Sequence, residues 1–298
     1  MTNTILQYQK AFNAMIDRLK SDKSVLAVMV FGSMVTGDLW EESDIDLFVV
    51  MDNAENIIKN IYTTEKNIPI HIKLMSKKKF LNLQNEDLKG GFIHRIFSAS
   101  RLVFSKDMDI TNRYDRGRYY PDLDREIWNM IYLAKTLKNI GVCKKYLANN
   151  RIYTAYVSAV KCSEDFAKLK INSSGYIVSK DVMSTTMNIE DDFKDNIDVL
   201  FFNKLNSEEC IRDIIKYLEE KIDENLINIT GFLLDFIREK DALLSSEEIK
   251  KDKIFKDFDI DMEEILNKLW KKNIIKKKAR GFSSENGNVL FEENVYYI

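Results

Sequence analysis

The pattern of hydrophobic and polar positions predicts an α/β region in the first third of the chain. Apolar residues recur at helical spacing between residues 5 and 21. Residues 25–31 and 45–51 are nearly uninterrupted apolar runs, and such runs are typical of central strands buried on both faces. Residues 68–74 alternate between apolar and polar positions, as a half-buried strand does, and residues 101–104 could add a fourth strand.

The pattern changes near Pro121, where helical spacing replaces the strand pattern. Asp122 is a candidate N-cap for a helix that continues through Leu137. Further amphipathic helices are expected at 151–170 and 207–226, with a less regular stretch between them. The middle third is therefore predicted to be a helical domain.

The last part of the chain has a third pattern. Helices are expected at 229–240 and 262–272, and Ser245 with Glu248 forms the capping-box signature of another helix between them. An Asn286-Gly287 pair between two short apolar segments indicates a β-hairpin. Three helices followed by a hairpin is the order of a winged helix.

These changes divide the chain into three predicted domains. We expect an α/β (α+β) domain with a mixed sheet at 1–121, a helical-bundle domain at 122–228 and a winged-helix-like domain at 229–298.

Composition narrows the class of protein. The chain has 45% hydrophobic and 31% charged residues and a net charge of −2, which indicates a globular protein without a global attraction for nucleic acid. No apolar stretch reaches the ~20 residues of a membrane span, and the N-terminus lacks the pattern of a signal peptide. We therefore expect a cytoplasmic protein that does not bind a membrane.

One segment carries the residues of a chemical site. Gly32 and Ser33 end the first predicted strand, and after ten intervening residues Asp44 and Asp46 mark the second. Glycine lets the backbone approach a phosphate closely, and the following helix offers N–H groups to the anion. Residues i and i+2 of a strand share a face, so the two carboxylates should project together and bind Mg²⁺ with triphosphate oxygens.

This segment resembles the motif of the DNA polymerase β-like nucleotidyltransferase superfamily: a hydrophobic residue, Gly-Ser, a spacer, and Asp-hydrophobic-Asp. The resemblance implies that Gly32 and Ser33 bind the triphosphate and that Asp44 and Asp46 are catalytic ligands of Mg²⁺. The helical middle domain makes the layout similar to that of the aminoglycoside and lincosamide nucleotidyltransferases.

The chain departs from the family pattern at one position. The family usually has a third carboxylate on the next strand, where this chain has His71 or, alternatively, Lys73. A neutral imidazole could accept a proton, so His71 is a candidate catalytic base; equally, it could be an ordinary exposed strand residue, with activity weakened or lost. Glu164 and Asp165 in the middle domain are alternative bases.

The motif and its resemblance together predict an enzyme. It would transfer a nucleoside monophosphate from an NTP, ATP by preference, to a hydroxyl of a small acceptor such as an antibiotic, and release pyrophosphate. One alternative is a nucleotidyltransferase that acts on protein or RNA. Another is a nucleotide-sensing regulator with a DNA-binding winged helix.

The charges of the last predicted helix bear on that regulator. Its first turns carry four acids, Asp259, Asp261, Glu263 and Glu264, which would repel DNA phosphates if the helix entered the major groove. A group of basic residues follows later, at 271–280, and could contact a nucleic-acid backbone. Nucleic-acid binding is therefore not favoured, and a homodimer is left open.

Overall fold

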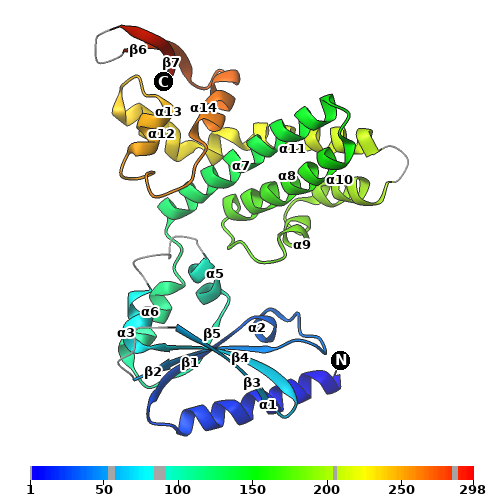
Figure 1. Ribbon diagram of the computed structural model, residues 1–298, viewed down its shortest axis with the longest axis vertical. Coiled ribbons are helices and arrows are strands. Elements are labelled where there is room, and N and C mark those ends of the chain that lie inside the picture. The colour runs from blue at the N-terminus through cyan, green and yellow to red at the C-terminus, as the bar shows by residue number, and fades with distance from the viewer. Residues whose placement is uncertain (1, 53–57, 84–91, 204–206, 284–287) are drawn as a thin grey trace. The chain divides into compact units, whose positions relative to one another are not determined.

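The computed structural model describes residues 2–52, 58–83, 92–203, 207–283 and 288–298 (Figure 1). The chain divides into two compact units, Met1–Pro121 and Asp122–Ile298. None of the helices in the described part of the chain combines the length and the hydropathy that a membrane crossing requires.

The first unit is built on a mixed sheet. Its strands are β1 (Val25–Phe31), β2 (Ile45–Met51), β3 (Ile58–Glu65), β4 (Ile68–Ser76) and β5 (Arg101–Ser105). Among the described residues they form a five-stranded sheet in the order β3-β4-β2-β1-β5. Strands β2 and β4 are parallel, whereas every other neighbouring pair is antiparallel. The predicted mixed α/β domain is thereby confirmed.

Helices cover both faces of this sheet. They are α1 (Thr2–Ser21), α2 (Ser33–Thr36), α3 (Lys77–Asn82), α5 (Phe92–Ser98) and α6 (Met108–Gly117). On one face, Phe12 of α1 belongs to the same buried core as Leu47 of β2. On the other, Phe97 of α5 packs against Phe48 with ring centroids 6.2 Å apart. Successive apolar residues of β2 therefore face different helices, as expected of a strand that is apolar on both faces.

Strand β3 was not predicted from the hydrophobic pattern. It lies at the edge of the sheet, and its side chains from Ile58 to Thr64 are all exposed, so burial imposes no apolar alternation on it. Its composition of Ile, Tyr and Thr was the available signal, because β-branched and aromatic residues favour strands. This strand matters for the site described below.

The second unit begins as a helical region, as expected. Its helices are α7 (Asp122–Ala148), α8 (Ile152–Ser173), α9 (Val182–Met187), α10 (Asp191–Phe202), α11 (Ser207–Ile229), α12 (Gly231–Lys240), α13 (Ser246–Lys251) and α14 (Met262–Lys271). Helix α7 extends well beyond the predicted end at Leu137. Helices α9 and α10 fall in the stretch where the sequence showed no regular pattern.

The end of the chain forms a small antiparallel sheet of β6 (Lys276–Ser283) and β7 (Val289–Tyr297). The predicted capping box of Ser245 and Glu248 is present at the start of α13. The predicted Asn286-Gly287 turn lies outside the described residues. One buried core includes residues from Ile127 to Tyr296, so α12–α14 and the hairpin pack together with α7–α11. A winged helix at 229–298 stays a prediction.

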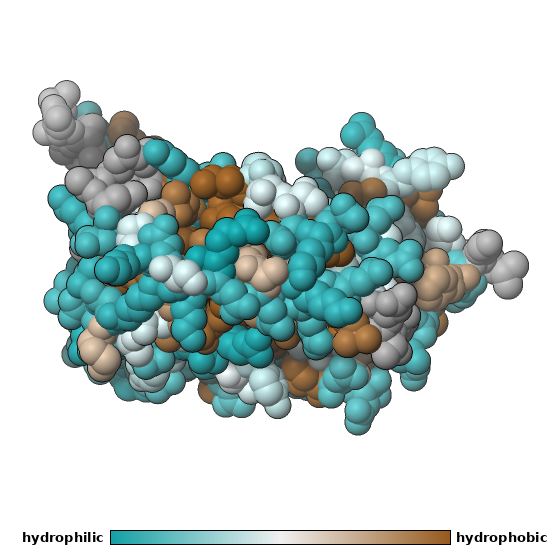
Figure 2. Space-filling view, turned by 90° about the horizontal axis from the view of Figure 1, so that it is seen from below, coloured by the Kyte–Doolittle hydropathy of each residue, from teal (hydrophilic) through white to brown (hydrophobic). Residues whose placement is uncertain are grey.

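The face of the molecule drawn in Figure 2, which is seen from below the view of Figure 1, is mostly polar. Figure 2 shows hydrophilic residues over most of this face and hydrophobic residues only in small, separate groups. Scattered exposed apolar residues of this kind are normal on folded proteins.

Candidate active site

Gly32 connects β1 to α2 in a backbone conformation that favours glycine. Its φ is +72°, in the left-handed half of backbone space. A Cβ at this position would lie only 2.4 Å from Oδ2 of Asp46. Both the dihedral angle and the close approach therefore require glycine, and the turn lies directly against the carboxylate.

Ser33 begins the single turn of α2, immediately after Gly32. The carbonyl oxygen of Gly32 accepts hydrogen bonds from the backbone N–H groups of Val35 and Thr36. The Ser33 hydroxyl donates to the backbone oxygen of Asp44 at 3.4 Å. The predicted phosphate-binding pair is thus held beside the chain segment that carries the carboxylates.

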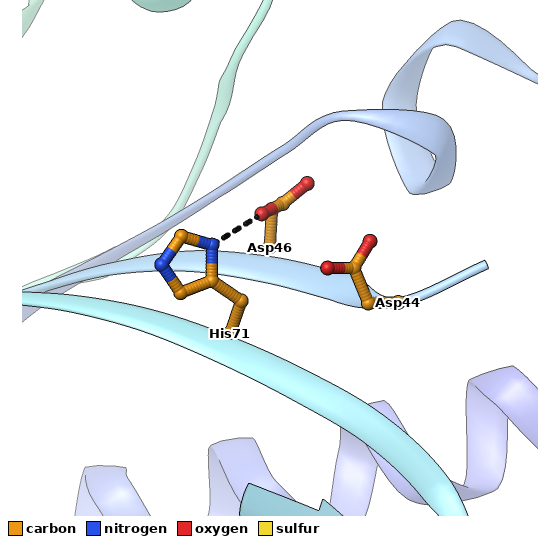
Figure 3. Close-up of side chains that lie close together, drawn as sticks. All are labelled: Asp44, Asp46 and His71. Carbon is orange, nitrogen blue, oxygen red and sulfur yellow. Dashed lines mark hydrogen bonds and ion pairs between the residues drawn. The ribbon is translucent and has the colours of Figure 1, made fainter. Parts of the chain in front are cut away.

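The two carboxylates and His71 lie close together at one end of the sheet. Asp44 lies one residue before β2 and is exposed, whereas Asp46 is half-buried within the strand. In the parallel register of β2 and β4, Asp46 is the partner of His71. One candidate ligand atom from each of the three side chains lies within 4.8 Å of the others (Figure 3).

His71 is held on three sides. Its Nδ1 lies 3.1 Å from Oδ1 of Asp46, and its Nε2 lies 3.2 Å from Oδ1 of Asn60. The Tyr62 ring stacks on the imidazole with centroids 4.6 Å apart and planes 5° from parallel. Asn60 and Tyr62 both belong to β3, so sequence analysis missed these neighbours together with their strand.

Tyr8 positions the loop before β2. Its side chain is fully buried, and its hydroxyl donates to the backbone oxygen of Ser43 at 2.6 Å and lies 3.3 Å from that of Glu41. Burial raises the pKa of the Tyr8 phenol, and the charge of Asp44 raises it further. The helical pattern predicted α1 but gave no sign of this contact, which joins residues far apart in the sequence.

The donor set fits a hard divalent cation. Asp44 and Asp46 provide carboxylate oxygens, which Mg²⁺ prefers, and the exposure of Asp44 leaves room for water or phosphate oxygens. An imidazole nitrogen is a less suitable donor for Mg²⁺. The carboxylate pair therefore fits the ion better than His71 does.

The alternative bases lie in the second unit and have partners there. Glu164 and Asp165, on α8, both pair with Lys168, at 2.8 and 3.5 Å. Asp165 also accepts a hydrogen bond from the side chain of Asn139 at 2.9 Å. Both carboxylates are therefore engaged by side chains of the helical region.

Comparison with known proteins supports a relationship for the first unit. Residues 13–109 match the family model of polymerase beta nucleotidyltransferases. A nucleotidyltransferase-like protein from Exiguobacterium sibiricum 255-15 has a similar structure, with a TM-score of 0.62. The match covers 97% of this chain and 99% of that chain at 14% identity, so it shows a shared fold. No curated protein has a matching sequence.

Proposed function

We propose that the protein is a Mg²⁺-dependent nucleotidyltransferase, because residues 13–109 match the family model of polymerase beta nucleotidyltransferases. It would transfer a nucleoside monophosphate from an NTP, ATP by preference, to a hydroxyl group of a small acceptor. The observation that carries this proposal is the Gly32-Ser33 turn, which lies against the Asp44–Asp46 carboxylate pair.

Each part of the site has a proposed role. The acceptor oxygen bonds to the α-phosphorus, the bond from that phosphorus to the pyrophosphate oxygen breaks, and the hydroxyl proton is released. Gly32 and Ser33 bind the triphosphate, and Asp44 and Asp46 hold Mg²⁺. Bound there, Mg²⁺ offsets negative charge that develops on the phosphate oxygens. A small hydroxylated acceptor, such as an antibiotic, is supported by the helical region that follows the transferase domain.

Pyrophosphate release tests this proposal. Purified protein would be incubated with Mg²⁺, each of the four common NTPs and a panel of hydroxylated acceptors. We expect release that depends on both an NTP and an acceptor. Asp44→Asn and Asp46→Asn should each abolish it, because one anionic ligand is lost.

A matched control lies on the same strand. Asp52 is an exposed aspartate directly after the opposite end of β2, so Asp52→Asn makes the same chemical change away from the site. This variant should keep wild-type turnover. Normal turnover in Asp44→Asn or Asp46→Asn would place the chemistry elsewhere.

A further inference from the structure

The hydrogen bonds of His71 restrict what its ring can do. Nδ1 faces a carboxylate oxygen of Asp46, and Nε2 faces the amide oxygen of Asn60. The ammonium group of Lys73 also donates to that amide oxygen, at 3.4 Å. Because an ammonium group can only donate, this bond requires the oxygen of Asn60, and not its nitrogen, at this position.

Both ring nitrogens of His71 therefore face acceptor oxygens, and because an ionised carboxylate can only accept, Nδ1 is assigned as the donor to Asp46. A nitrogen that donates its proton to a carboxylate has no lone pair available for a cation or for a second proton. In this arrangement Nδ1 of His71 is neither a metal ligand nor a base toward a substrate hydroxyl. Nε2 is directed to Asn60 on the edge strand, on the side of the ring away from Asp46 (Figure 3).

The same contacts fix the Asp46 carboxylate. Oδ1 is held by His71, and Oδ2 lies so close to the Gly32 backbone that a Cβ there would be 2.4 Å away. Stacking against Tyr62 keeps the imidazole ring from turning. The imidazole and the carboxylate are mostly shielded from solvent, with side-chain exposures of 14% and 19%, so water competes weakly for their hydrogen bond.

We infer that His71 is a positioning residue, which orients the Asp46 carboxylate for the cation in place of a third carboxylate ligand. Asn60 and Tyr62 of β3 hold the ring in that role. The inference rests on the proposed metal site. A hydrogen-bond partner that orients a metal ligand typically contributes about 10- to 100-fold to metal affinity.

Binding of Mn²⁺ alone, measured by electron paramagnetic resonance on the whole protein, tests this inference without substrate or turnover. His71→Asn places an amide N–H at nearly the position of Nδ1, whereas His71→Gln moves the amide one methylene further out. We expect His71→Asn to bind Mn²⁺ nearly as tightly as the wild type. His71→Gln and His71→Ala should bind about 10- to 100-fold more weakly.

The electron spin echo of bound Mn²⁺ separates positioning from ligation. A directly coordinated imidazole would add nitrogen modulation to the wild-type echo, and we expect none from His71. Nitrogen modulation that disappears in His71→Asn would overturn the inference. So would equal Mn²⁺ affinity in His71→Asn and His71→Gln, with both variants folded as judged by thermal unfolding.

Asp46→Asn distinguishes this inference from the proposed function. If Asp46→Asn binds Mn²⁺ as tightly as the wild type, the metal site is wrong and the proposed function fails with it. If Asp46→Asn weakens binding while all three His71 variants leave it unchanged, only the positioning role is wrong. Tyr62→Leu should weaken binding and Tyr62→Phe should not, because only the aromatic ring stacks on His71.

Discussion

At the scale of single residues, two glycines stand at the two ends of α2, and the sequence alone does not distinguish their roles. Gly32 and Gly37 both have positive φ values, +72° and +89°. A Cβ on Gly32 would meet Asp46, whereas a Cβ on Gly37 would meet nothing within 4 Å. A side chain would therefore strain the backbone at both positions, but it would collide with the Asp46 carboxylate only at Gly32.

This difference gives a prediction with an internal control. Gly32→Ala should displace Asp46 and greatly reduce both Mn²⁺ binding and nucleotide transfer. Gly37→Ala should lower the free energy of unfolding by about 1–2 kcal/mol, from the left-handed backbone alone, and keep Mn²⁺ binding. Calorimetry and Mn²⁺ titration of both variants would check this, and similar metal affinities would show that the Asp46 contact is unimportant.

Arg113, on α6, is a second residue whose environment only the fold reveals. Its side chain is buried, and none of its guanidinium nitrogens has a hydrogen-bond partner in the described structure. The guanidinium carbon lies 5.7 Å from the centre of the Phe97 ring, a partial compensation. Burial lowers the pKa of Arg113 to about 10.

A buried cation that has no hydrogen-bond partner among the described residues should destabilise the first unit. Arg113→Met fills similar space without the desolvation cost, so we expect the free energy of unfolding to rise by about 1–3 kcal/mol. Urea denaturation at neutral pH measures this. Arg101→Met, at an exposed position on β5, is the control and should change little. Destabilisation of Arg113→Met would contradict this expectation and indicate that the guanidinium makes a net stabilising contact.

At the scale of elements, α1 does more than cover the sheet, because Tyr8 holds the loop that ends at Asp44. Tyr8→Phe keeps the buried ring and removes the hydrogen bond to Ser43. We expect a loss of about 0.5–1.5 kcal/mol in the free energy of unfolding, with weaker Mn²⁺ binding because Asp44 is less restrained. Tyr153→Phe, at an 89% exposed tyrosine of α8, should change neither quantity.

Glu190 joins three helices of the second unit. It stands at the N-terminal boundary of α10, and its carboxylate pairs with Lys170 of α8 and with Lys221 of α11, the latter at 2.7 Å. Burial by itself would raise the pKa of Glu190, but the two lysines outweigh it and the pKa is lowered. A carboxyl with a lowered folded-state pKa stabilises the fold above its unfolded-state pKa, and this contribution is lost as the pH falls.

The stability of a Glu190→Gln variant should therefore depend on pH. We expect it to be less stable than the wild type at pH 7 and the difference to narrow as the pH falls below about 4. Thermal unfolding across this range would measure the difference. Glu220→Gln, at an exposed position on α11, should show no comparable trend. A constant difference at all pH values would mean that packing, and not charge, is responsible.

At the scale of the whole molecule, the acids at the start of α14 are used within the second unit. Asp261 pairs with Lys138 of α7 at 3.0 Å, and Glu263 accepts a hydrogen bond from Tyr296 of β7 at 2.6 Å. Both acids thus fasten α14 to its neighbours. A helix that reads DNA presents its N-terminal residues to the major groove, and these residues are engaged elsewhere.

We accordingly expect the full chain to show no sequence-specific binding to duplex DNA. Any binding at low salt should be lost at physiological salt, because it would depend on non-specific contacts of basic residues, such as Lys276 and Lys278 of β6, with the nucleic-acid backbone. Fluorescence anisotropy with random and selected duplexes over a salt series is the measurement. Tight binding to one sequence at physiological salt would instead favour a regulator.

Patterns within short segments of the sequence were enough to predict the central strands and the candidate site. Apart from Asp46, residues 25–31 and 45–51 are apolar on both faces, and a run of this kind has few stable places other than the middle of a sheet. Gly32, Ser33, Asp44 and Asp46 are close in sequence, so the backbone geometry of one turn and one strand is enough to bring them together.

Contacts between distant segments were decided only by the tertiary structure. The partnership of Asp46 with His71 depends on the register of two parallel strands, and Asn60 reaches the ring from an edge strand whose exposed side chains leave no hydrophobic pattern. Tyr8 reaches Ser43 from a helix that precedes both strands. Local patterns record which residues are buried, whereas the partners of a buried polar group depend on how separate elements pack.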